Sequence, residues 1–67
     1  MTVQQIIALA RKHVGANPSM ESSARLCLFD AVTCNDEADY PAAKRRALQS
    51  LAYSIGVFHR DYKKAQA

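Results

Sequence analysis

Apolar and polar residues alternate with the period of an α-helix along most of this chain. The first apolar stripe recurs every three or four residues and consists of Val3, Ile6, Ile7, Ala10 and Val14. That spacing places all five side chains on one face of a helix. Thr2, followed three residues later by Gln5, is typical of the capping box that opens a helix. The pattern therefore predicts an N-terminal helix over about residues 3–14.

A second helical pattern covers about residues 19–35. Its apolar stripe consists of Met20, Ala24, Cys27, Leu28, Ala31 and Cys34. We expect Ser19 or Asn17 to cap its first turn. Leu26 and Phe29 fall on the opposite side of this helix, among polar residues, where a helix with one buried face does not need a phenylalanine. Either a partner chain or the N-terminal helix should therefore cover these two side chains.

A third pattern follows the turn "NDEADYP" and runs over about residues 40–62. Its inner stripe consists of Tyr40, Ala43, Ala47, Leu51, Ile55 and Phe58. Asp39 is placed to cap this helix, and Pro41 is tolerated in its first turn. The stripe keeps its phase across Gly56, which itself falls on the flank beside Tyr53. We therefore expect the helix to continue through Gly56, with the glycine at a close contact rather than at a helix end.

The three patterns predict an all-α protein with one domain, residues 1–67. A helical hairpin (about 19–35 and 40–62) is accompanied by an additional N-terminal helix (about 3–14). A chain this short buries only about 60% of the surface that its unfolded form exposes. Cys27 and Cys34 would lie roughly 10 Å apart on one helix, whereas a disulfide needs about 7 Å. Because no disulfide supplements the small core, we expect a homodimer.

Several classes of function are disfavoured by the residues present. His13, His59 and the two cysteines lack the spacing of a zinc site. The chain has no glycine-rich phosphate loop, and its cysteines lie on an apolar stripe where thiols are inert. We therefore expect no enzyme activity, no metal and no cofactor. With no basic region before the first apolar segment and no run of about 20 apolar residues, we expect a cytoplasmic protein without membrane insertion.

One flank of the third helix is basic and partly aromatic, and these residue types are enriched at the centres of protein interfaces. We predict a protein-binding or dimer interface formed by Leu26, Phe29, Arg45, Arg46, Gln49, Tyr53, Gly56, Val57 and Arg60.

The net charge of +3 also permits a nucleic acid as the partner. In that alternative, phosphates would be neutralised by Lys44, Arg45, Arg46, Arg60, Lys63 and Lys64.

Part of the chain, residues 24–51, resembles a single tetratricopeptide hairpin. The segment "DEADYPAAKRRAL" matches the turn and second helix of that family at Asp39, Tyr40, Ala43 and Leu48 or Leu51. Tetratricopeptide hairpins work in arrays, because one hairpin alone cannot bury both of its faces. This resemblance also implies that the chain needs a partner.

The segment "SLAYSIGVFHRDYKK", together with the length and the all-helical pattern, resembles small accessory proteins of temperate Mu-like phages. Some members of that group are dimeric helical hairpins that bind and disable host proteins, including a quorum-sensing transcription activator and a pilus-assembly ATPase. The resemblance implies a modulator that inhibits a host protein in the cytoplasm of a bacterial host cell.

Overall fold

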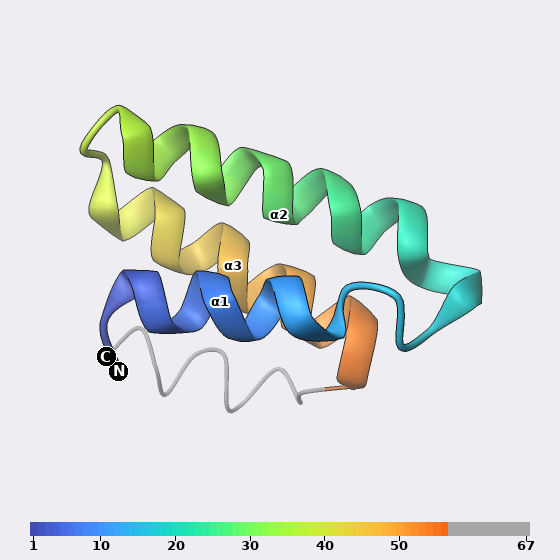
Figure 1. Cartoon of the computed structure of the whole chain (residues 1–67). Coiled ribbons are helices and arrows are strands. Elements are labelled where there is room, and N and C mark those ends of the chain that lie inside the picture. The colour runs from blue at the N-terminus through green and yellow to red at the C-terminus, as the bar shows by residue number, and fades with distance from the viewer. Residues whose placement is uncertain (57–67) are drawn as a thin grey trace.

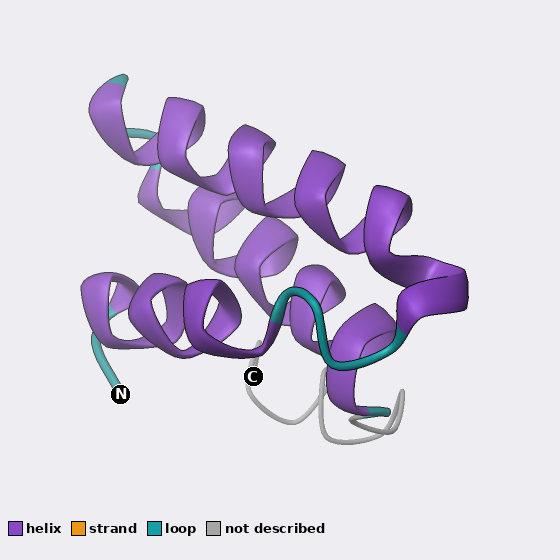
Figure 2. Ribbon diagram, turned by 45° about the vertical axis from the view of Figure 1, so that its right-hand side comes forward, coloured by secondary structure: helices purple, strands orange, loops and turns teal. Residues whose placement is uncertain are grey.

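The computed structural model describes residues 1–56, which form three α-helices and one short 3₁₀ helix (Figure 1). Their bounds are α1 Val3–His13, η1 Pro18–Met20, α2 Glu21–Asp36 and α3 Tyr40–Ile55. Helices α2 and α3 form an antiparallel hairpin, and α1 lies alongside it (Figures 1 and 2). The predicted all-α fold, a hairpin with an additional N-terminal helix, is confirmed.

Helix α1 begins with the predicted capping box. The backbone N–H of Gln5 donates to Thr2 Oγ1 at 3.2 Å, and the backbone N–H of Thr2 donates to Gln5 Oε1 at 2.8 Å. Arg11, Lys12 and His13 occupy the last turn. Positive charge is favourable there because the helix dipole places its negative end at the C-terminus.

Helices α2 and α3 contact each other through small side chains. Ala24 and Ala31 of α2 and Ala43 and Ala47 of α3 are completely buried. Ser50 is completely buried as well, and its hydroxyl donates to the carbonyl of Ala24 at 2.8 Å. Because a buried hydroxyl without a partner is costly, this bond satisfies Ser50 and also joins the two helices.

Larger apolar side chains gather where α1 packs on the hairpin. The buried cluster consists of Ile6, Ile7, Ala10, Ala31, Ala47, Leu48 and Leu51. Helix α1 contacts α3 more extensively than it contacts α2. The core therefore lies on one side of the hairpin, and α1 does not reach the outer side of α2.

A Schellman motif closes the end of α2. The N–H of Asp39 donates to the carbonyl of Cys34 at 2.8 Å, and the N–H of Ala38 donates to the carbonyl of Asn35 at 3.0 Å. Ala38 has a φ of +60°, in the left-handed region where this motif usually places glycine. The turn between the helices therefore holds an alanine in a backbone conformation that disfavours a Cβ atom.

Helix α3 begins as predicted and ends earlier than predicted. The Asp39 side chain accepts a hydrogen bond from the N–H of Ala42 at 3.4 Å, and Pro41 lies in the first turn. The helix ends at Ile55, and Gly56 follows it with a φ of +72°. The predicted continuation of the helix through Gly56 is therefore wrong, because the glycine adopts the left-handed conformation that terminates helices.

The close contact expected at Gly56 is also not present among residues 1–56. A Cβ atom built at Gly56 would meet no described atom within 4 Å. The glycine is thus required there by its positive φ rather than by a neighbouring chain segment. Phe58 and the rest of the expected third helix lie outside the described residues.

The predicted caps of α2 are wrong. A 3₁₀ turn precedes α2, and neither Ser19 nor Asn17 caps its first turn. The Ser19 hydroxyl instead donates to Asn17 Oδ1 at 2.8 Å, while Asn17 Nδ2 reaches the carbonyl of Tyr53 on α3 at 3.5 Å. Both polar side chains are therefore used to fix the loop against α3.

Two members of the predicted inner stripe of α3 are not buried. Tyr40 is 50% exposed and Ile55 is 43% exposed. They are the first and last residues of the helix. Residues at the helix ends are therefore covered less by the rest of the hairpin than residues in the middle of the stripe. Leu48, Ser50 and Ser54 are buried instead.

In the part of the chain that the structure describes, no helix has both the length and the apolar character needed to cross a membrane.

Candidate protein-binding face

The outer side of α2 carries two large apolar side chains that the fold leaves uncovered. Leu26 is 64% exposed and Phe29 is 69% exposed. They are three residues apart and therefore neighbours on one face of the helix. We call Leu26 and Phe29 the apolar patch. The alternative that α1 covers them is wrong, because α1 packs on the other side of the hairpin.

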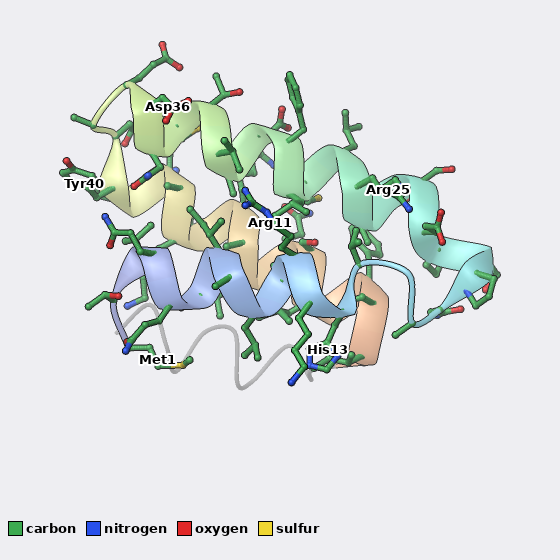
Figure 3. All side chains as sticks on the ribbon, viewed as in Figure 1. Met1, Arg11, His13, Arg25, Asp36 and Tyr40 are labelled. Atoms are coloured by element: carbon green, nitrogen blue, oxygen red, sulfur yellow. The ribbon has the colours of Figure 1, made fainter. Side chains whose placement is uncertain are left out.

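Polar contacts border the apolar patch. Arg25 Nε donates to Glu21 Oε2 at 3.0 Å, an ion pair within α2. Figure 3 shows Arg25 on α2. Thr33 Oγ1 donates to the carbonyl of Phe29 at 3.0 Å, so this hydroxyl is satisfied within the helix. An apolar centre with a polar rim is the usual arrangement of a protein interface.

Two of the predicted binding residues of α3 contact each other. Arg46 Nη1 donates to Gln49 Oε1 at 3.2 Å. Burial raises the pKa of the Cys27 thiol, the charge of nearby Arg46 opposes that rise, and Asp30 adds to it. A buried thiol with a raised pKa is a poor nucleophile.

The other predicted binding residues are spread over different parts of the surface. Arg45 is exposed on α3, Tyr53 is partly buried, and Gly56 is exposed after the last turn. The structure thus brings Leu26 beside Phe29 on α2 and joins Arg46 to Gln49 on α3 by a hydrogen bond. Val57 and Arg60 lie outside the described residues.

Sequence reasoning missed a hollow between the start of α1 and the start of α3. It has a volume of about 480 Å³ and is lined by Val3, Tyr40, Pro41, Lys44 and Arg45. The sequence offered one sign of this hollow. Tyr40 and Lys44, like Pro41 and Arg45, are four residues apart and are therefore neighbours on the helix surface. The contribution of Val3 comes from a distant part of the chain.

Neither a metal site nor a known relative defines the function of this chain. Within residues 1–56, no three side chains of His, Cys, Asp or Glu lie close enough together to hold a metal ion. Both cysteines are free, with Cys27 buried and Cys34 partly exposed. The chain matches no protein-family model, no curated protein and no solved structure. Its function is therefore inferred from the surfaces described above.

Proposed function

We propose that this chain is a small non-enzymatic modulator that binds another protein through the apolar patch and inhibits that protein. The exposure of Leu26 and Phe29 is the observation that supports the proposal. Complete burial of either side chain stabilises by about 1.5–3 kcal/mol. Because roughly two thirds of each is exposed, burial against a partner would contribute about 1–2 kcal/mol per side chain.

The same patch supports a homodimer. A domain of this size buries a small core, and α1 covers only one side of the hairpin. In helical repeat arrays the uncovered side of such a hairpin is buried by the next repeat. A second copy of the chain would complete the hairpin in an equivalent way.

A host protein of a bacterium is the proposed target of inhibition. The resemblance to accessory proteins of Mu-like phages supports a transcription activator or a pilus motor protein as the partner. A binder without catalytic groups can act only by covering a surface or by shifting the partner between its states. Occlusion through the apolar patch requires nothing beyond the contact itself.

Nucleic-acid binding is the second candidate function. Lys44 and Arg45 are adjacent on α3, and neither makes an ion pair or hydrogen bond to another residue in the range 1–56. The two functions differ in salt dependence. Phosphate binding weakens steeply and log-linearly as salt rises, whereas an apolar contact changes little.

Sedimentation velocity of the purified full chain tests the proposal. We expect the wild type to self-associate and the double variant Leu26→Ala/Phe29→Ala to do so at least about 25-fold more weakly. Ile55→Ala is the matched control, since it truncates another exposed aliphatic side chain. We expect Ile55→Ala to keep the wild-type association.

Affinity capture from nuclease-treated bacterial lysate, at low and high salt, extends the same comparison to foreign partners. We expect the double variant to lose proteins that wild type and Ile55→Ala both retain at high salt. A wild type that stays monomeric at every concentration and captures the same proteins as the double variant would refute the proposal. Capture that disappears after nuclease treatment would favour nucleic-acid binding instead.

A further inference from the structure

The hollow at the start of α3 is a concave surface, separate from the apolar patch. Val3, Tyr40 and Pro41 give it an apolar floor, and Lys44 and Arg45 give it two cations. We call these five residues the basic hollow. Figure 3 shows Met1 and Tyr40 at the same end of the molecule, where α1 and α3 both begin. Its volume is about 480 Å³.

The cations of the basic hollow are not used by the rest of the described chain. Arg25 is paired with Glu21, and Arg46 is bonded to Gln49. In contrast, no residue among 1–56 pairs with Lys44 or Arg45. Because no residue in the range 1–56 engages these cations, this part of the chain leaves two positive charges in the hollow beside an apolar surface.

The attraction for an anion comes from these side chains and not from the end of α3. Pro41 has no N–H group, and the N–H of Ala42 is already bound by Asp39. The first turn therefore offers few free donors. The planar guanidinium of Arg45 is suited to a carboxylate, which it can bind through two parallel hydrogen bonds.

We propose that the basic hollow binds an acidic peptide segment of a partner protein. An aliphatic or aromatic side chain of the peptide would rest against Val3, Tyr40 and Pro41, while its carboxylates would bind Lys44 and Arg45. This inference goes beyond the proposed function, because it assigns a second interaction surface on the opposite helix of the hairpin. It holds whether or not the apolar patch binds a protein.

The surrounding charges favour a peptide over a nucleic acid. Asp36, Glu37 and Asp39 lie in or beside the turn that leads into α3. A nucleic-acid strand carries a charge on every nucleotide, so it would be repelled where it passes these carboxylates. A peptide can instead place its acidic residues only at the two cations. The hollow is open and is lined by residues of α1 and α3. A small molecule bound there would keep much of its surface exposed, whereas ligand pockets bury most of their ligand.

Nuclear magnetic resonance of the isotope-labelled full chain tests the inference, with the synthetic peptide GDFEG, blocked at both termini, as the probe. We expect saturable shifts of the backbone amides of Val3, Tyr40 and Lys44. Lys44→Gln/Arg45→Gln should weaken peptide binding roughly five- to tenfold, as expected for two exposed ion pairs. The control Arg11→Gln/Lys12→Gln removes the same charge from the exposed last turn of α1 and should leave peptide binding unchanged.

Further outcomes decide between the alternatives. Unchanged peptide binding in Phe29→Ala would support a site independent of the apolar patch. The absence of saturable shifts, or an equal loss in the control variant, would overturn the inference. Binding of GDAEG as tightly as GDFEG would also overturn it, because the apolar residues of the hollow would then contribute nothing. Tighter binding of an oligothymidylate to the same amides would assign the hollow to nucleic acid and overturn it as well.

Discussion

Replacing the alanine at the turn between α2 and α3 with glycine should stabilise the fold. Ala38 has a φ of +60° and occupies the position in the Schellman motif that glycine usually fills. An L-residue pays about 1–2 kcal/mol to adopt this left-handed conformation. Glycine avoids that strain. However, glycine loses more conformational entropy on folding than alanine does, and this loss offsets about 0.5–1 kcal/mol of the gain. Ala38→Gly should therefore stabilise the fold by about 0.5–1 kcal/mol.

Thermal unfolding followed by far-ultraviolet circular dichroism measures this gain. For a domain of this size, 1 kcal/mol corresponds to about 4–8 °C in Tm, so Ala38→Gly should raise Tm by about 2–8 °C. Ala52→Gly is the matched control, because Ala52 lies inside α3. Glycine within a helix costs about 1 kcal/mol relative to alanine, so the control should lower Tm. A lower Tm in Ala38→Gly would refute the conformation assigned to the turn.

Two further predictions concern the interior of the hairpin. Ser50→Ala removes the 2.8 Å hydrogen bond to the Ala24 carbonyl and should lower the free energy of unfolding by about 0.5–1.5 kcal/mol; an unchanged urea midpoint would contradict this. Iodoacetamide should alkylate Cys34 before Cys27, because Cys27 is buried. The raised pKa of the Cys27 thiol also keeps its reactive thiolate fraction low until the pH rises. Equal alkylation rates, measured by mass spectrometry, would count against the burial of Cys27.

The helices and the exposed patch were predictable because both depend on local spacing. The stripes of apolar residues placed all three helices, and the position of Leu26 and Phe29 opposite the stripe of α2 indicated that they lie on a separate face. The Asp39 cap was predictable for the same reason, since it depends on contacts within one turn.

The features that sequence reasoning missed depend on contacts between distant residues or on backbone angles. Asn17 is held by Tyr53, which no pattern around residue 17 could reveal. Periodicity cannot tell a continuing helix from one that ends at Gly56, because only the φ of the glycine distinguishes them. The basic hollow needs Val3 beside Lys44, and that pairing depends on which side of the hairpin α1 covers.

Photo-crosslinking in living bacteria tests most directly whether the apolar patch contacts another chain. The substitution Phe29→p-benzoylphenylalanine places the reactive group within the patch, and the same substitution at Ala8, which is exposed on α1, is the control. We predict that irradiation yields defined higher-mass adducts from position 29 and few from position 8. Position 29 yielding only the free chain, or the same adducts as position 8, would contradict the proposal.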